Sequence, residues 1–418
     1  MAHTAVLAGD PCFDRILDAV PRREAFRRRF GVGPGQRLVV LNSTWGRRSL
    51  FGSDELSWLL AELVGALPAD EYRVCAVLHP NIWHGHGPGQ VRRWLRTAQD
   101  SGLLLVPPLG AWRQALVAAD CVIGDHGSVT YYAAALGTPV LLGAFPEDDL
   151  DPASPVAELG RTAARLHPYE PLRPQLERTL AGHIPGRYDA LGAQTTSAPG
   201  ESAGLLRQMF YDLMGRSEPE RPALLERLGL PGADVVPVTE PLRVLTQVRT
   251  DVRTDVRNSA GQAQAPEISV TRYVGHSPAG SDALYGAPYD AHTAVHEDTR
   301  DPTRLTLADL VLGYAPEHPA AWTADALRQR PYAAMAVAVT GTDNCLVRTG
   351  DGRLATLNAR SGQDGYPDPC DPAVYASALH AWLESGRPVD ELAVGMTVVT
   401  GRVRHHITVA VTSPPPTR

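Results

Sequence analysis

Between Gln36 and Phe145 the sequence alternates short apolar runs with longer amphipathic stretches, and this regularity constrains the fold more than any other feature. Each apolar run is rich in β-branched residues and ends at a small or polar turn, as strands do when helices connect them in parallel. The predicted strands are Leu38–Leu41, Val74–Leu78, Leu103–Val106, Cys121–Ile123 and Val140–Leu142, and the predicted helices are Asp54–Leu67, Gln90–Asp100, Ala111–Ala118 and Ser128–Leu136.

The predicted strands are apolar on both faces, which is expected when helices cover a sheet on each side. Right-handed crossovers then produce a doubly wound, Rossmann-like parallel sheet. Helical patterns continue through Ser154–Leu166, Leu172–Ala181 and Ala203–Met214. We therefore predict one α/β domain over residues 1–214.

The character of the chain changes after Gly215. Prolines stand at positions 219, 222, 231, 237 and 241, and a polar repeat of Val, Arg, Thr and Asp occupies residues 248–257. Such composition is typical of a linker, which we assign to residues 215–266.

Residues 267–418 are predicted to form a smaller α+β domain whose role the sequence does not assign. The segment Thr349–Arg353 contains two glycines between alternating runs, a pattern that indicates a β-hairpin. His405 and His406 are adjacent on a predicted strand, so their side chains are expected on opposite faces. The predicted helices are Leu305–Gly313, Ala320–Arg328 and Pro372–Ser385, and the predicted strands are Met335–Thr340, Cys345–Thr349, Arg353–Asn358, Met396–Val403 and His406–Thr412.

All 39 basic residues are arginine, because the chain contains no lysine. P-loop phosphate binding, Schiff-base chemistry and a pyridoxal phosphate anchor each require a lysine amine and are therefore excluded. Together with the richness in Ala, Gly and Pro, the composition is typical of a high-GC bacterial genome.

The formal charge of −7 and the lack of a strongly basic half argue against nucleic acid as a partner. Five widely spread cysteines without a CxxC pair favour free thiols in a reducing compartment. No apolar run reaches the roughly 18 residues of a membrane span, and no signal peptide is recognisable. We therefore expect a cytoplasmic protein.

Polar and aromatic residues gather just after the predicted strands. In an open parallel sheet, ligands bind at the carboxyl ends of the strands, so these residues are the candidate site. They are Ser43, Thr44, Trp45 and Arg47 after the first strand, His79 after the second, Pro108, Leu109 and Gly110 after the third, and Asp125, His126, Gly127, Ser128, Val129 and Thr130 after the fourth.

The clearest physical signal is at Gly127 and Ser128, where a helix is predicted to begin. The unpaired backbone N–H groups of a helix N-terminus form an anion site that suits a pyrophosphate. Gly127 would let the ligand approach the backbone, and the hydroxyl of Ser128 or Thr130 would donate to a phosphate oxygen. An ordinary N-cap at Ser128 explains the same pattern.

The segment Cys121–Leu142, CVIGDHGSVTYYAAALGTPVLL, resembles the nucleotide-binding segment of two-domain GT-B glycosyltransferases, particularly the CDP-glycerol glycerophosphotransferase group. Earlier segments resemble that group in the same order: Ala8–Asp14, Ser43–Trp45 and Leu78–Pro80. The resemblance covers residues 5–170. It implies a transferase that moves a glycosyl or glycerophosphate unit from a nucleotide-diphosphate donor of the CDP or UDP type.

The resemblance also implies roles for the candidate residues. The Asp125–Thr130 loop would bind the pyrophosphate, Pro108 to Gly110 would contact the base through backbone groups, and Ser43 and Thr44 would face the transferred group. His79 would be catalytic, assisting departure of the diphosphate. Independently of the resemblance, Arg47 and Arg48, just after Trp45, would point into the same cleft and clamp a phosphate as bidentate donors, and a solvated loop explains them equally well.

No cofactor or metal is expected. His84 and His86 lie close together, as do His292 and His296, but no further residues complete a coordination set at a recognisable spacing.

Two departures from the family pattern bear on function. Tyr132 stands where the family carries an acidic residue for the ribose hydroxyls, and only about 35 residues precede the first strand, so an acceptor domain is not expected in this chain. The alternatives are a non-catalytic binding or scaffold module, or a split transferase completed by a second polypeptide or by self-association. A split transferase should expose apolar surface near Trp45, Trp83 and Leu109.

Overall fold

Six parallel strands form the sheet of the first domain in the computed structural model, which describes residues 5–232, 237–249, 265–275, 290–360 and 370–412. The strand order is β3-β2-β1-β4-β5-β6, which is the order of a Rossmann-like sheet. The GT-B-like half-domain predicted from the sequence is thus present as a fold. The strands are β1 (Arg37–Ser43), β2 (Tyr72–Leu78), β3 (Leu104–Val106), β4 (Cys121–Asp125), β5 (Val140–Ala144) and β6 (Ala164–Arg165).

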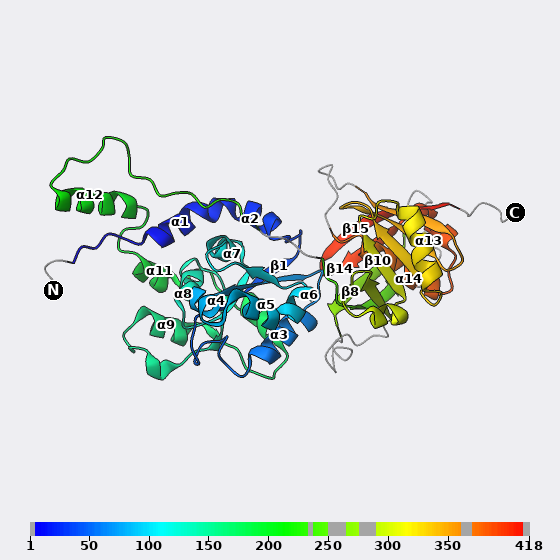
Figure 1. The fold of residues 1–418 in the computed structure, drawn as a ribbon, viewed down its shortest axis with the longest axis horizontal. Helices are drawn as coiled ribbons and strands as arrows, with labels where there is room; N and C mark the ends of the chain where they lie inside the picture. The colour runs from blue at the N-terminus through cyan, green and yellow to red at the C-terminus, as the bar shows by residue number, and fades with distance from the viewer. Residues whose placement is uncertain (1–4, 233–236, 250–264, 276–289, 361–369, 413–418) are drawn as a thin grey trace.

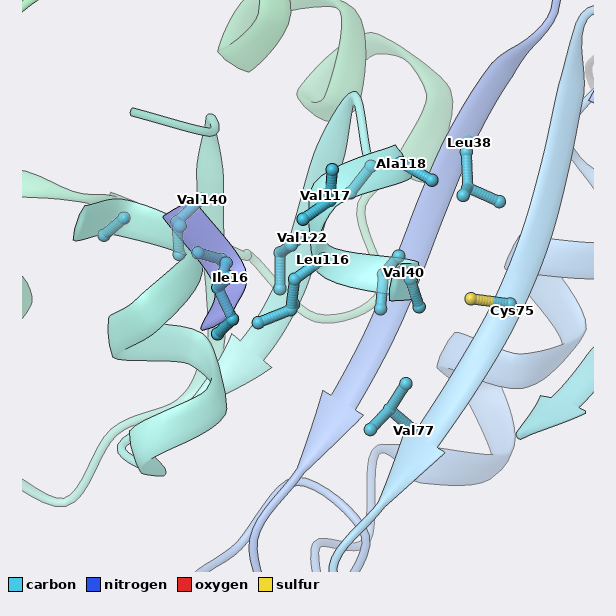
Figure 2. Close-up of a cluster of buried hydrophobic side chains, with 14 of the residues drawn as sticks. Ile16, Leu38, Val40, Cys75, Val77, Leu116, Val117, Ala118, Val122 and Val140 are labelled. Carbon is cyan, nitrogen blue, oxygen red and sulfur yellow. The ribbon is translucent and has the colours of Figure 1, made fainter. Parts of the chain in front are cut away.

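Alternate residues of the central strands face opposite layers of helices. Leu38 and Val40 of β1 belong to one buried cluster, whereas Val39 and Leu41 belong to another on the other face. Figure 2 shows the first cluster, in which side chains of β1 and β2 lie on the side of the sheet that α7 covers. This double covering confirms the prediction drawn from strands that are apolar on both faces.

The helices of this domain are mostly short. The predicted helix Gln90–Asp100 is divided into two, and a further helix, α4, precedes it directly after β2. The helices are α1 (Pro11–Ala19), α2 (Arg23–Arg29), α3 (Leu56–Gly65), α4 (Pro80–His86), α5 (Pro88–Trp94), α6 (Arg96–Asp100), α7 (Trp112–Ala118), α8 (Ser128–Ala135), α9 (Pro155–Thr162), α10 (Leu172–Ala181), α11 (Asp189–Thr195) and α12 (Ser202–Met214).

The second domain is a closed β-barrel, beside the sheet domain in Figure 1. Its strand order is β10-β11-β12-β13-β15-β14-β8-β7-β9, and the parallel pair β9 and β10 closes it. The strands are β7 (Leu242–Arg249), β8 (Glu267–Val274), β9 (Asp290–His296), β10 (Leu310–Tyr314), β11 (Met335–Val339), β12 (Asn344–Thr349), β13 (Leu354–Ala359), β14 (Met396–Thr400) and β15 (Val403–Thr412).

One helix fills the barrel. All residues from Ala373 to Trp382 of α14 (Ala373–Glu384) are buried, as expected of a helix that is surrounded by apolar walls. It contacts β7, β8, β11, β12 and β14. The other helix, α13 (Pro319–Gln329), packs outside the barrel through Trp322 and Ala326.

The sequence predictions for the second half need correction in two places. The predicted helix Leu305–Gly313 is wrong: a 3₁₀ helix covers Pro302–Leu307, and the next apolar run is strand β10, which pairs in parallel with both β9 and β11. Strand β7 lies within the predicted linker, because its residues pair with β8 and β9 rather than remaining solvated. Most of the polar repeat over 248–257 lies outside the described residues.

Two local predictions in this domain are confirmed. Strands β12 and β13 form the expected hairpin, in which the amide of Gly352 donates to the carbonyl of Thr349. His405 is buried and bonded to Thr400, whereas His406 is exposed. The five cysteines are free thiols.

The barrel packs against the amino edge of the parallel sheet. The amide of Ala69, just before β2, donates to the carbonyl of Arg272 in β8 at 2.9 Å, and the Arg272 guanidinium pairs with Asp70 at 2.6 Å. The carboxyl edge, where the candidate site lies, faces away from this contact. Among the described helices, none has both the length and the apolar character needed to cross a membrane.

Candidate functional site

The carboxyl edge of the sheet is organised around Asp125, the last residue of β4. Its side chain is fully buried, and its carboxylate accepts from the Ser43 hydroxyl at 2.9 Å and from the amides of Thr44, Leu50 and Gly127 at 2.9, 3.0 and 3.1 Å. These bonds tie the loop after β1 to the start of α8. Asp125 therefore positions the loops of the site, and its oxygens are occupied within the protein.

Thr130 also has an internal role. Its hydroxyl accepts from the Asn42 side-chain amide at 2.8 Å, and both residues are buried. A Cβ on Gly124 would lie 2.3 Å from this hydroxyl oxygen, so the close contact between β4 and α8 requires glycine there. The Thr130 side chain thus fixes α8 against β1 instead of facing solvent.

The first turn of α8 presents free backbone donors. Gly127 is the N-cap, and no side chain of the described residues caps the helix. Ser128 is exposed and Val129 half-buried, so the amides of this turn are accessible to an anion. His126 lies beside them with a buried Nδ1 atom that has no hydrogen-bond partner among the described residues.

The structure gives Gly127 a packing role that the sequence did not predict. A Cβ added there would lie 3.0 Å from the Cβ of Thr44 and 3.1 Å from Oδ1 of Asp125. The neighbouring loop thus favours glycine here, because both distances are shorter than most real Cβ contacts. Ser128 is the first residue of the helix rather than its cap, so the N-cap interpretation of its hydroxyl is wrong.

A cavity of about 990 Å3 opens between the loop after β1 and helices α3, α4 and α5, and the described residues that line it include none from the first turn of α8. Trp45, directly after Thr44, is 57% exposed at its rim. The loop folds back on itself at Gly52, where only glycine fits, because a Cβ there would lie 2.2 Å from the carbonyl oxygen of Gly46. The aromatic and polar lining consists of Trp45, Arg47, Ser49, Phe51, Ser57, Asn81, His84, His86 and Trp94.

His79 caps helix α4 beside the cavity. Its Nδ1 accepts from the amide of Asn81 at 3.1 Å, and its ring lies 6.4 Å from that of Trp45. Because Nδ1 is the acceptor, the neutral imidazole carries its proton on Nε2. His79 is therefore a cap whose second nitrogen remains a donor.

The two neighbouring arginines differ in their contacts. Arg48 pairs with Asp149 of the segment after β5. Arg47 lines the cavity, is exposed, and has no ion pair within the described part of the chain. Of the two, only Arg47 keeps its guanidinium available for a ligand.

The remaining predicted residues lie apart. Pro108, Leu109 and Gly110 follow β3 at the same edge but do not line the cavity, and Leu109 is 84% exposed. Asn81, Ser57 and Trp94 line the cavity without having been predicted. Asn81 and Trp94 lie in short helices after β2 that sequence periodicity did not separate, whereas Ser57 lies in the predicted helix before β2 and carried no signal of its own.

Tyr132 joins α8 to the N-terminal helix. Its hydroxyl donates to Oδ2 of Asp10 at 2.6 Å, and its ring stacks between Phe13 and Trp112 at centroid distances of 5.6 and 6.3 Å. Burial and the Asp10 carboxylate raise the pKa of the Tyr132 hydroxyl. An acidic residue is thus present beside Tyr132, although it comes from another helix.

No metal centre is evident in the ranges that the structure covers: no three His, Cys, Asp or Glu side chains are grouped to hold an ion. His84 and His86 face the cavity, and the His86 ring packs edge-on against Trp94 at 4.9 Å.

No protein-family model matches the sequence, and no curated protein matches it either. Solved structures with a similar fold include a variant of the wall teichoic acid polymerase TagF soaked with CDPG, at 14% identity, a TM-score of 0.35 and 51% coverage of each chain. A glycosyltransferase from Rickettsia africae has 10% identity and a TM-score of 0.33, covering 50% of this chain and 57% of the other.

A UDP-GlcNAc 2-epimerase from Neisseria meningitidis, bound to UDP-GlcNAc, has 15% identity and a TM-score of 0.31, covering 50% of this chain and 54% of the other. The present chain thus spans about half the length of these proteins.

Proposed function

We propose that the parallel-sheet domain binds a nucleotide-diphosphate donor of the CDP or UDP type at its carboxyl edge, in a glycosyl or glycerophosphate transfer reaction. The observation that carries this proposal is the uncapped first turn of α8, which lies against Thr44 in the loop after β1. The same loop carries Arg47, which lines the 990 Å3 cavity and has no ion pair among the described residues. Free helix amides and an available guanidinium are two independent sources of affinity for phosphate oxygens.

Each group has a distinct part in this proposal. The amides of Ser128 and Val129 and the Ser128 hydroxyl donate to the pyrophosphate, and His126 adds a ring nitrogen that lacks a partner. The Nε2–H of His79 would stabilise charge that develops on the leaving diphosphate. Trp45 offers an apolar face at the rim of the cavity. Asp125 and Thr130 do not contact the ligand in this proposal, but fix the loop after β1 and helix α8, which carry these groups.

Calorimetric titration with CDP, UDP and GDP tests the proposal. We expect binding of at least one nucleotide in the micromolar to millimolar range, and a loss of about tenfold in Arg47→Ala, since a hydrogen bond to a charged group contributes roughly 1.5–3 kcal/mol. The adjacent Arg48→Ala is the matched control, because Arg48 is already paired with Asp149. Absence of heat with all three nucleotides at millimolar concentration would contradict the proposal.

A second candidate is a transferase completed by another polypeptide or by a second copy of this chain. The open carboxyl edge favours it, since the barrel packs on the opposite edge and Trp45 and Leu109 are exposed. Trp83 does not contribute, because it is 1% exposed inside the sheet domain. Concentration-dependent association in light-scattering chromatography, weakened by Leu109→Ser, would support this candidate, and a monomer at all concentrations would contradict self-association.

A further inference from the structure

A second large cavity lies between the two domains, away from the carboxyl edge. It has a volume of about 1320 Å3 and is lined by the amino edge of the sheet on one side and by one mouth of the barrel on the other. Ligand sites occur preferentially at domain interfaces and at barrel mouths, and this cleft is both. We call it the interdomain cleft.

Most cations of the interdomain cleft are already matched within the protein. Arg272 of β8 is buried and pairs with Asp70 at 2.6 Å and Asp371 at 2.7 Å, and Asp371 also accepts from the hydroxyl of Tyr314 at 2.8 Å. Arg23 and Arg27 of α2 share the carboxylate of Asp120, each at 2.6 Å.

The other N–H groups of the Arg23 and Arg27 guanidiniums also have acceptors. Arg23 donates to the carbonyls of Val117 and Ala119, and Arg27 donates to that of Ala118, all at the C-terminus of α7. Cations stabilise a helix C-terminus, so these two arginines have a structural explanation.

Arg73 has no such explanation. It lies near the start of β2 and lines the interdomain cleft, and its Nε atom is buried without a hydrogen-bond partner among the described residues. Within the described ranges no ion pair joins it to a carboxylate, and burial lowers the pKa of its guanidinium. Arg73 as a whole is half-buried, so its terminal nitrogens are open to the cleft while its Nε atom lacks a partner. A guanidinium that faces a large cavity without a counter-charge is available to bind an anion.

We propose that the interdomain cleft binds a small organic molecule through an oxyanion group, a phosphate or a carboxylate, which pairs with Arg73. The planar guanidinium matches two oxygens of such a group. Val238 and Leu242 from the barrel side, with Val32 from the sheet side, offer apolar surface to the rest of the ligand. This site is independent of the proposed nucleotide site, which lies at the other edge of the sheet.

Thermal unfolding of the full chain in the presence of inorganic phosphate, pyrophosphate or succinate tests the proposal, with sodium chloride at the same ionic strength as the reference. At saturating millimolar concentration we expect at least one oxyanion to raise the unfolding midpoint by roughly 2–4 °C. Arg73→Met should abolish this rise. Without ligand, Arg73→Met should unfold at the same temperature as the wild type or higher, because it removes an unmatched charge.

Two control variants make the outcomes separable. Arg28 lines the same cleft but is exposed, so Arg28→Met should keep the response to the anion. Arg47→Ala at the carboxyl edge should keep it too, and a response lost in that variant alone would assign the anion to the nucleotide site and overturn the present proposal.

The proposal is also overturned by an equal response in Arg73→Met, or by no response of the wild type to any of the three anions. Arg73→Gln serves as a second variant for the case that methionine packs poorly. If both variants unfold well below the wild type without ligand, Arg73 is structural and the proposal fails.

Discussion

The two edges of the parallel sheet are held by opposite electrostatic arrangements. At the carboxyl edge a buried anion, Asp125, is surrounded by neutral donors from neighbouring loops. At the amino edge a buried cation, Arg272, is surrounded by two carboxylates, one of which lies 202 residues away in the sequence. The first arrangement shapes loops around an open cavity, whereas the second joins two domains. A buried charge can therefore prepare a site or seal an interface, depending on whether its partners are loop amides or fixed counter-charges.

The largest effect is expected at the sealed edge. Arg272→Met leaves Asp70 and Asp371 without their common partner, and removal of one member of a buried ion pair typically costs about 3–5 kcal/mol. We expect a corresponding fall in the free energy of unfolding, measured by urea titration followed by circular dichroism. Arg249→Met, which removes an exposed pair with Glu267, is the control and should cost less than about 1 kcal/mol. Similar losses in both variants would contradict the assigned role of Arg272.

At the open edge, Asp125→Asn should destabilise the sheet domain by about 2–3 kcal/mol. Asparagine replaces one carboxylate oxygen with an NH2 group, which donates instead of accepting. At least one of the groups that now donate to Asp125 therefore loses its acceptor. The variant should also weaken nucleotide binding, because the loop that carries Arg47 is no longer fixed to α8. Unchanged binding with reduced stability would show that the loop is positioned by other contacts.

The stability of the barrel should depend on pH through one buried histidine, His292. Burial, with a smaller contribution from the charge on His380, lowers the pKa of His292 in the barrel to about 3. The unfolded chain therefore binds a proton near pH 6.5 that the folded barrel does not accept, and stability falls as the pH drops below about 6.5. Between pH 7 and pH 5 this one group should cost about 2 kcal/mol.

His292→Gln should flatten this pH dependence of barrel unfolding, whereas His406→Gln, at an exposed position on β15, should not. The readout is the slope of unfolding free energy against pH, since His292 also bonds to Ser377 at 3.0 Å and its replacement changes stability at every pH. A slope that His292→Gln leaves unaltered would contradict the assignment.

The smallest effect on stability is expected for Ser128→Ala. Because Ser128 is exposed and Gly127 is the N-cap, the change in unfolding free energy should lie within about 0.5 kcal/mol. Nucleotide affinity should nevertheless fall by roughly 0.5–3 kcal/mol if the hydroxyl donates to the diphosphate. Paired thermal unfolding and calorimetry on the same variant provide the measurement, and a loss of stability without a loss of affinity would contradict the site.

Sequence reasoning was most successful where the information is local. The apolar runs at Leu38–Leu41 and Cys121–Ile123 became β1 and β4, and the turn at Thr349–Arg353 became a hairpin, because strand periodicity and turn chemistry act over a few residues. It failed for β7 and β10, whose assignment depends on pairing with distant strands. The site was predicted only in part: the edge of the sheet was anticipated, but the cavity wall formed by Trp94 and Asn81 was not.

The sequence by itself determined the parallel sheet, since composition and periodicity report burial directly. It also determined the edge at which polar loops gather and the free thiols that the cysteine spacing favours. Only the tertiary structure decided which residues of that edge face a ligand. It turned Asp125 and Thr130 inward, assigned Arg48 to Asp149 and left Arg47 available. It also decided that the barrel covers the amino edge, because the contact between Asp70 and Arg272 joins residues whose local sequences contain no sign of one another.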